Sequence, residues 1–233
     1  MPRRFQSGSG GLTFHVVNRG ARRLRLFDDL EDYLSFSRCV AEALEIVDLD
    51  LFAFCVMPNH FHLVVRPKED PDLTHFMRVM TLRHCKRWHR RRGTRGGGAV
   101  YQGRFRAFPI DTESYFYAAC RYVEANPLRA GIVARAEDWP WSSLYQRVRN
   151  CQILKLSNWP ILQPGHWTQL VNTEQNHDEI GQLRKSARSN LPFGEPAWTL
   201  ATATLLGTAR SLRRSGPRPR VPAELKSGIN SSN

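Results

Sequence analysis

The chain has 233 residues, and its 34 Lys and Arg outnumber its 21 Asp and Glu, so its formal net charge is +13. Hydrophobic residues make up 41%, which excludes a disordered chain, and no apolar run approaches the roughly 20 residues of a membrane-spanning helix. Five scattered cysteines without a CxxC pair exclude a disulfide framework and a zinc ribbon, and they indicate a reducing cytoplasm. The positive charge predicts an anionic partner, for which nucleic acid is the best candidate.

The first part of the chain predicts strands and amphipathic helices in alternation. β-branched and aromatic runs predict the strands, and apolar residues spaced by three and four predict the helices. The predicted elements are a strand over 13–18, a helix over 28–47, strands over 51–57 and 60–66, and a helix over 73–91. Pro58-Asn59 is a tight turn signal, so residues 51–66 should form a β-hairpin. A positive, glycine-rich loop follows over 91–98.

A fourth strand is predicted over 101–110, and a third helix should begin at Asp111 or Thr112 and run to about Ala125, since Pro127 stops it. The order β-α-β-β-α-β-α predicts an α+β protein with a ferredoxin-like, RRM-like antiparallel sheet and flanking helices, which we expect on one face.

Strand signals fade beyond about residue 150. Residues 137–150 predict a loop or short helix, and residues 178–189 and 196–206 predict two helices. We therefore expect a domain over 1–149, a basic, mostly helical extension over 150–214, and a disordered basic tail over 215–233.

The positive charge is concentrated in two zones. Ten basic residues and no acidic one lie between Arg78 and Arg106, and eight basic residues with only Glu195 against them lie between Arg184 and Arg220. Long like-charged blocks repel themselves unless a polyanion neutralises them. One short basic run would indicate a solvated surface, but two long zones favour contact with nucleic acid.

His60 and His62 alternate along a predicted strand, so both imidazoles should lie on the same face. Two adjacent imidazoles form half of a metal site. Two surface histidines are the simpler interpretation of a bare His-x-His pair. The tight turn before the pair and the apolar residues 63–65 after it indicate a central strand instead.

Tyr122 and Asn126 are four residues apart on the predicted third helix and should share a face. A phenol oxygen can act as a nucleophile, and an amide oxygen one turn later can be a third metal ligand. Glu124 is an alternative carboxylate ligand. A core tyrosine beside a helix-capping Asn is the structural alternative.

Four blocks in fixed order carry a family resemblance, namely MPNHFHLVV, YQGRFRAF, RYVEANPLRAGIV and DWPWSSLY. With Asn18-Arg19-Gly20 they resemble the REP-associated tyrosine transposases, single-tyrosine members of the HUH nuclease superfamily that are akin to the IS200-like transposases. The resemblance runs from about residue 12 to 146. The later stretch LRKSARSNLPFGEPAW resembles the C-terminal extension of longer members.

The resemblance implies a ferredoxin-like catalytic domain over 1–149 that acts on single-stranded DNA at REP-type palindromic hairpins. By position, His60 and His62 match the HUH histidines, Tyr122 matches the nucleophile, and Asn126 completes the metal site. The implied reaction is metal-dependent cleavage and strand transfer through a 5′-phosphotyrosine that leaves a free 3′-hydroxyl. Two imidazoles and an oxygen suit Mn²⁺ or Mg²⁺.

Basic residues near these blocks are candidate DNA contacts, since phosphate contacts supply affinity. The candidates are Arg83, Lys86, Arg90, Arg104 and Arg106. Trp139, Trp141 and the loop around Gly96 could stack on bases or read DNA shape, although core packing is the favoured interpretation of both tryptophans.

Two other functions fit the same pattern. A four-stranded sheet can also serve a non-catalytic binder of single-stranded nucleic acid, and a metal site can serve a hydrolase that uses water. A DNA partner predicts a cytoplasmic, nucleoid-associated protein without a membrane partner. The target hairpin, the oligomeric state and the role of the extension stay open at this point.

Overall fold

The computed structural model describes residues 8–111 and 114–212. Its centre is a four-stranded antiparallel sheet with the order β2-β3-β1-β4. The strands are β1 (Thr13–Arg19), β2 (Leu49–Met57), β3 (His60–Pro67) and β4 (Arg106–Ile110). The predicted hairpin is confirmed, because β2 and β3 pair directly on either side of the Pro58-Asn59 turn. The order places β3 and β1 in the middle of the sheet.

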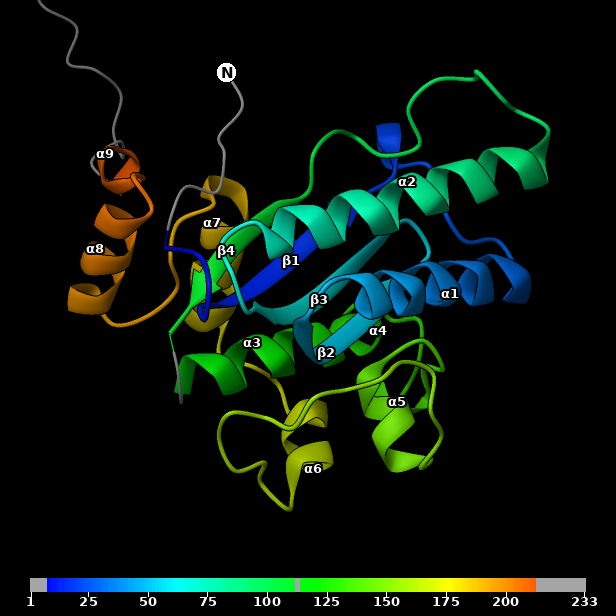
Figure 1. Ribbon diagram of the computed structural model, residues 1–233. Coiled ribbons are helices and arrows are strands. Elements are labelled where there is room, and N and C mark those ends of the chain that lie inside the picture. Colours follow the sequence, from blue (N-terminus) through cyan, green and yellow to red (C-terminus); the bar gives the residue numbers. More distant parts are fainter. Residues whose placement is uncertain (1–7, 112–113, 213–233) are drawn as a thin grey trace, which may run out of the picture.

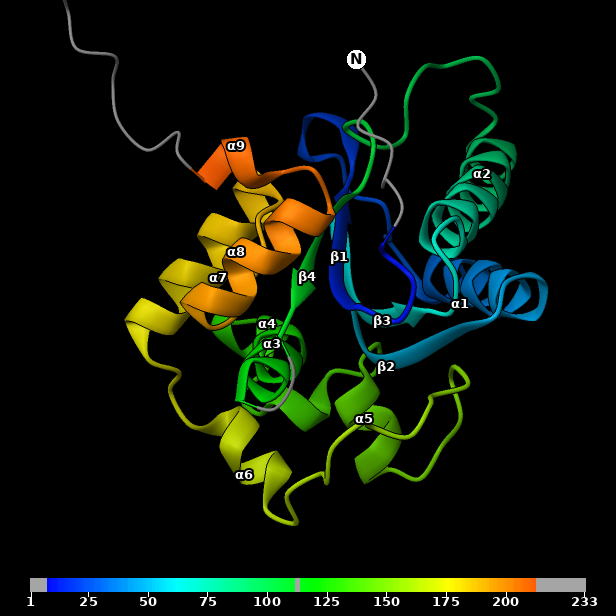
Figure 2. The ribbon, with the colours of Figure 1, turned by 60° about the vertical axis from the view of Figure 1, so that its left-hand side comes forward.

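Two helices, α1 (Leu30–Ile46) and α2 (Asp72–Arg92), cover one face of the sheet (Figures 1 and 2). The Asp29 carboxylate caps α1 by accepting from the Asp32 amide. Alternate strand residues such as Phe14, Phe54 and Phe61 are buried with both helices in one hydrophobic cluster. This burial explains why the period-two and period-3.6 patterns could be assigned from sequence.

The opposite face of the sheet is also covered, which differs from the single helical face expected. Its strand residues are buried against the helix α3 (Ser114–Glu124) in a second cluster. The remaining helices are α4 (Asn126–Arg129), α5 (Ser143–Val148), α6 (Trp167–Asn172), α7 (His177–Ser189), α8 (Pro196–Leu205) and α9 (Ala209–Leu212), with 3-10 turns at Ala21–Arg23 and Ala136–Asp138. The α+β class is confirmed, and both sheet faces are apolar because helices lie on both.

The fourth strand begins later than the sequence predicts. Tyr101 forms an isolated bridge to Gly20, and the chain then turns through Gly103, whose φ of 150° leaves regular strand geometry. Regular pairing with β1 resumes at Arg106. The helix α3 begins at Ser114; Thr112, one of the two predicted caps, and the predicted tail over 215–233 lie outside the described residues.

Carboxylates of α1 neutralise part of the first basic zone. Arg91 and Arg92 both contact Asp32, which is buried, at 2.6 Å. One and two turns earlier in α2, Arg87 and Arg83 contact Glu42 at 2.5 and 2.7 Å respectively. These pairs fasten α2 to α1, so several of the ten basic residues serve the packing of the two helices.

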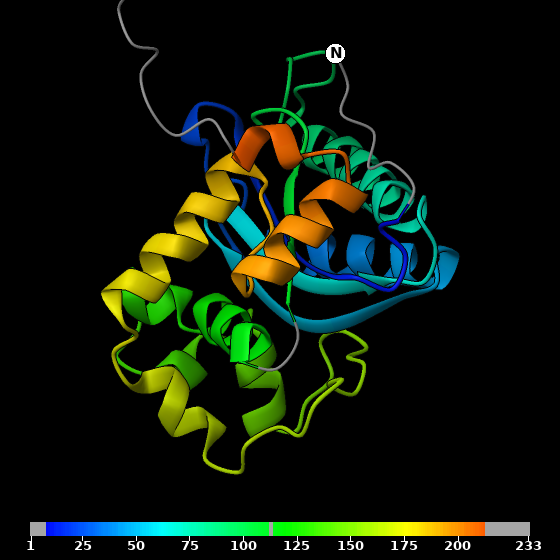
Figure 3. The same cartoon turned by 90° about the vertical axis from the view of Figure 1, so that its left-hand side faces the viewer.

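The extension packs on the edge of the sheet and beneath α3. Phe193 bridges Ile110 of β4, and its amide donates to the Pro109 carbonyl at 2.9 Å, which covers the outer edge of that strand. The helices α7 and α8, yellow to orange in Figure 3, lie beside β4. The boundary between residues 149 and 150 stays a prediction.

Both tryptophans of the DWPWSSLY block are packed against the core. Trp139 donates its indole N–H to the Val56 carbonyl at 2.9 Å, and Trp141 stacks on Tyr33 with ring centroids 4.6 Å apart. The favoured core-packing interpretation is therefore confirmed. Among the described residues, no helix is long and apolar enough to cross a membrane.

Glu124 is fully buried at the centre of the packing between α3, α5 and α6. Its carboxylate accepts from Ser143, from Arg147 and, at 2.6 Å, from the indole of Trp167. A buried carboxylate that accepts from three donors is a structural centre, because both of its oxygens are engaged there.

We expect Glu124→Ala to lower the free energy of unfolding by about 3–5 kcal/mol, since Arg147 loses its only charge partner in the described structure and Trp167 loses an acceptor. Urea denaturation measures this loss. Exchange of the exposed Glu31 for Ala is the matched control and should cost less than about 1 kcal/mol. An equal effect of both substitutions would contradict the structural role of Glu124.

His84 of α2 predicts a pH-dependent stability. Burial lowers its pKa to about 3, and its Nδ1 lies 2.7 Å from the Tyr101 hydroxyl. Below pH 6.5 His84 is protonated in the unfolded chain but stays neutral in the folded chain, so the free energy of unfolding falls with falling pH. Between pH 6.5 and 4 we expect this one residue to contribute up to about 1.4 kcal/mol per pH unit. Denaturation curves of wild type and His84→Gln should differ in this slope, and parallel curves would exclude the assignment.

Candidate active site

The strand register brings the two predicted histidines to one face of the sheet. His60 is paired with Arg19 and His62 with Val17 on β1, and both pairs share the face that α3 covers. The imidazole centroids of His60 and His62 are 4.9 Å apart, with their planes at 82°. The position on a central strand follows from the hairpin and confirms the predicted juxtaposition.

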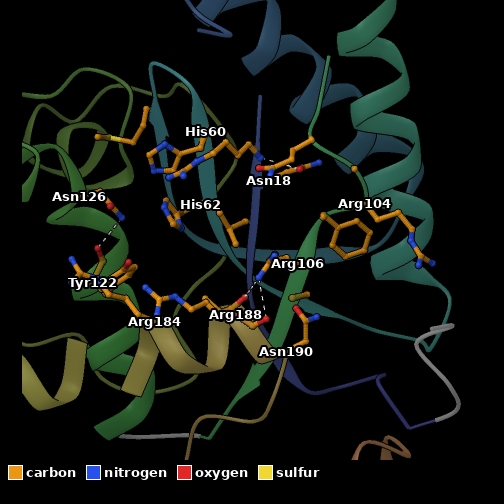
Figure 4. Close-up of a pocket in the computed structure, with 18 of the residues that line it drawn as sticks. Asn18, His60, His62, Arg104, Arg106, Tyr122, Asn126, Arg184, Arg188 and Asn190 are labelled. Atoms are coloured by element: carbon orange, nitrogen blue, oxygen red, sulfur yellow. Dashed lines mark hydrogen bonds between the residues drawn. The ribbon is translucent and has the colours of Figure 1, made fainter. Parts of the chain in front are cut away.

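His60 and His62 line a cavity of about 1620 Å³. Its walls are β1, β3, the segment leading into β4 and the start of α2, together with α3, α4 and α7 (Figure 4). Tyr122 and Asn126, the two predicted residues from the third helix, line the same cavity. The structure thus gathers His60, His62, Tyr122 and Asn126 around one space.

A third histidine, which the sequence analysis missed, stands behind His62. His15 of β1 is buried, and its Nε2 lies 2.8 Å from Nδ1 of His62, while its own Nδ1 has no hydrogen-bond partner in the described structure. His60 uses its Nδ1 in the same way, at 2.7 Å from the Asn59 side chain. Both contacts engage Nδ1 and leave Nε2 of each cavity histidine for a ligand.

The three imidazoles are neutral at physiological pH. Burial lowers the pKa of His15 to about 3 and that of His60 to about 4, with smaller contributions from Arg129 and Arg19 respectively. Burial also lowers the pKa of His62 well below its ordinary value, assisted by the neighbouring His60 and His15. A neutral imidazole is the form that binds a metal ion.

Tyr122 lies against the histidines with its phenol directed to the cavity. Its ring centroid is 5.9 Å from that of His62 and 5.8 Å from that of His15. Within residues 8–111 and 114–212 its hydroxyl has no hydrogen-bond partner. An unengaged phenol beside two imidazoles suits a nucleophile better than a core tyrosine.

Asn126 begins α4 directly after α3 has ended. Its Nδ2 donates to the carbonyls of Tyr122 and Val123 at 3.0 and 3.3 Å. The amide nitrogen is thereby used, and the amide oxygen is the atom left for a cation. This arrangement keeps Asn126 next to Tyr122 although the two residues are on separate helices.

The donor set fits a divalent metal ion. Two neutral imidazole nitrogens and one amide oxygen can hold Mn²⁺ or Mg²⁺ with water in the remaining positions. No group of three His, Cys, Asp or Glu in the described part of the chain could hold a metal. The amide oxygen of Asn126, which lines the same cavity, is the candidate third ligand of such a site.

The alternative metal ligand Glu124 is wrong. Its side chain points away from the cavity into the network with Ser143, Arg147 and Trp167. The physical reason is helical phase, since Glu124 lies two residues after Tyr122 and so on another face of α3.

The cavity is strongly basic. No Asp or Glu is found among its described lining residues. Seven of these residues are arginines, namely Arg19, Arg78, Arg104, Arg106, Arg129, Arg184 and Arg188. Arg104 and Arg106 line this cavity, and their role as DNA contacts stays a prediction. Arg106 also donates to the Arg188 carbonyl at the end of α7, at 3.0 Å. The arginines come from separate segments, so their convergence is a property of the fold.

The three predicted α2 contacts lie outside this cavity. Arg83 forms an ion pair with Glu42 of α1 and stays a prediction as a phosphate contact. Lys86 and Arg90 are exposed and stay predictions as outer DNA contacts, as does the exposed loop around Gly96. Helical periodicity alone did not show that this part of α2 packs against an acidic neighbour.

Comparisons with known proteins agree with this site. A family model described as IS200-like transposase matches residues 9–126. A Haemophilus influenzae protein assigned by name to the REP-associated tyrosine transposases is 25% identical over 60% of this chain and 83% of its own length. The REP-associated tyrosine transposase of Escherichia coli K12 is 24% identical over 60% of this chain and 79% of its own length.

A solved structure has the same fold. It is titled as a REP-associated tyrosine transposase bound to a REP hairpin, and it aligns with a TM-score of 0.51 and 22% identity over 68% of this chain and 92% of that chain. The predicted resemblance is thus confirmed. The match of the family model over half of the sequence shows that this chain belongs to the IS200-like transposase family, as an enzyme of the tyrosine transposase class.

Proposed function

We propose that this protein cleaves and joins single-stranded DNA at REP-type palindromic hairpins, with Tyr122 as the nucleophile. The observation that carries the proposal is the meeting of Tyr122, His60, His62 and Asn126 in one arginine-rich cavity. Family membership supports the reaction type, and the hairpin-bound relative of the same fold supports the substrate class.

A divalent cation, Mn²⁺ or Mg²⁺, is the proposed cofactor. Nε2 of His60, Nε2 of His62 and the amide oxygen of Asn126 would hold it, and when bound it supplies Lewis-acid polarisation of the phosphate. The contacts of Nδ1 with Asn59 and His15 orient the two imidazoles. Imidazoles fixed in this way favour metal binding, because little side-chain conformational entropy is lost when the metal binds.

In the proposed reaction the Tyr122 oxygen forms a bond to phosphorus, and the bond from phosphorus to the 3′ oxygen of the preceding nucleotide breaks. The products are a 5′-phosphotyrosine and a free 3′-hydroxyl. The energy of the phosphodiester is kept in the covalent bond, so attack by another 3′-hydroxyl releases Tyr122 and joins the strands.

The arginines of the cavity are proposed to bind the DNA backbone. Arg78, Arg104 and Arg184 are exposed and line the cavity, so they can contact phosphates without losing an internal partner. Such contacts give affinity that falls with salt but no sequence choice. The extension, which contributes Arg184 and Arg188, would thus take part in DNA binding, and a location in the cytoplasm at the nucleoid follows from the proposed substrate.

Tyr122→Phe should form no covalent adduct, because the attacking oxygen is absent. The assay incubates labelled REP-type hairpin oligonucleotides with Mn²⁺ or Mg²⁺ and detects SDS-resistant complexes on a gel. Tyr145→Phe is the matched control, since Tyr145 of α5 lies outside the cavity, and it should form the adduct as wild type does. An adduct with Tyr122→Phe would show that another residue is the nucleophile.

The same assay separates the two other functions. Cleavage without an adduct that survives Tyr122→Phe would indicate a hydrolase that uses water. Hairpin binding by wild type without cleavage on any hairpin tested would favour a non-catalytic binder.

His62→Ala should abolish Mn²⁺ binding in isothermal titration calorimetry, because a direct ligand is lost. His15→Ala should weaken the binding by about 10–100-fold, because His62 then loses the contact that orients it. His75→Ala is the control, since His75 of α2 lines the cavity but is not a proposed ligand, and it should leave the affinity unchanged. Unchanged Mn²⁺ affinity in His62→Ala would refute the metal site.

A further inference from the structure

Arg129, the last residue of α4, is stacked on the proposed nucleophile. Its guanidinium carbon lies 4.2 Å from the centroid of the Tyr122 ring, and its Nη2 donates to the Tyr122 carbonyl at 2.7 Å. Burial lowers the pKa of Arg129, and no carboxylate of the described structure forms an ion pair with it. A half-buried cation without an acidic partner costs free energy, and here hydrogen bonds and a ring face stand in for the missing carboxylate.

The second arm of the guanidinium is held by the extension. Arg129 Nη1 donates to Oε1 of Gln175 at 3.1 Å. Gln175 is buried between α6 and α7, and its own Nε2 donates to the Ala118 carbonyl of α3 at 3.3 Å and to Glu179 of α7 at 3.1 Å. Gln175 is therefore tied to the helix that carries Tyr122 and to the helix that walls the cavity.

Gln175 is not among the residues that line the cavity. It cannot touch a bound strand there, and any effect on the reaction must pass through Arg129. Both residues also lie beyond residue 126, where the match of the family model ends.

We propose that Gln175 and Arg129 are positioning residues that fix the Tyr122 ring for attack, so that the extension acts on catalysis as well as on DNA. The inference rests on the proposed role of Tyr122. The helix α3 ends two residues after Tyr122, where terminal carbonyls lack helical donors, and the Arg129 fork supplies one while it covers the ring face. A ring fixed at both points keeps its oxygen near the attack geometry, which matters because a misplacement of about 1 Å can slow a reaction about 100-fold.

The test compares Gln175→Leu with Gln182→Leu, a control at an exposed position of α7. In single-turnover assays with a REP-type hairpin and Mn²⁺, Gln175→Leu should form the adduct about 10–100-fold more slowly. Its hairpin Kd should stay within about twofold, because the phosphate contacts remain. Gln182→Leu should match wild type in both. A wild-type rate in Gln175→Leu, or a loss of rate fully explained by weaker DNA binding, would overturn the proposal.

Arg129→Lys separates position from charge. Lysine keeps the positive charge but not the planar fork that reaches both Gln175 and the Tyr122 carbonyl. We expect the rate of Arg129→Lys to fall as in Gln175→Leu, and the double variant to fall little further, because both changes break one chain of contacts. A wild-type rate in Arg129→Lys would show that charge alone suffices and would overturn the proposal.

A readout without DNA keeps this inference separate from the proposed reaction. The ¹³C ring resonances of Tyr122, assigned through Tyr122→Phe, should shift in Gln175→Leu and Arg129→Lys but not in Gln182→Leu. If wild type forms no adduct, the proposed function fails, while the resonances still decide whether Gln175 and Arg129 hold the ring. Unshifted resonances in both variants would overturn the positioning role.

Discussion

The pairing of β3 with β1 is the constraint on which the site depends. Because the register sets Val17 against His62 and Arg19 against His60, both imidazoles face α3, and His15 comes within hydrogen-bond distance of His62. A slip by one residue would turn the two imidazoles toward α1 and α2 and bury them among apolar side chains. The apolar residues of both strand faces, packed in two separate clusters, prevent such a slip.

Local patterns explain what could be predicted from the sequence. The alternation of His60 and His62, the turn at Pro58-Asn59 and the proline after α3 act over a few residues, so most elements followed from them. The preference for Tyr122 and Asn126 as site residues came from the family resemblance, since local pattern alone left a structural interpretation open. His15 could not be found in this way, since its contact with His62 depends on which strands are neighbours. The second covered face was missed for a similar reason, because it depends on where α3 returns to the sheet.

The number of basic residues in each segment could be read from the sequence, but the surface that each basic side chain faces could not. The first basic zone divides between the two sides of the molecule: Arg83 and Arg91 pair with carboxylates of α1 and its cap, whereas Arg104 reaches the cavity. The other four of the seven cavity arginines are Arg19, Arg129 of α4, and Arg184 and Arg188 of α7, which lie outside this zone. A count of charges per segment cannot distinguish these cases, because the distinction depends on the partner across the packing interface.

The arginines and histidines of the cavity depend on each other electrostatically. An arginine near an imidazole disfavours its protonation, and Arg19 and Arg129 lower the pKa of His60 and His15 respectively in addition to the effect of burial. The same positive charges favour an approaching phosphate. One charge distribution therefore keeps the imidazoles in the form that binds a metal and attracts the anionic strand. Arg129 lowers the pKa of His15, adds to the positive charge of the cavity and contacts both the ring and the carbonyl of Tyr122. These three roles account for a cation without a carboxylate partner at the centre of the site.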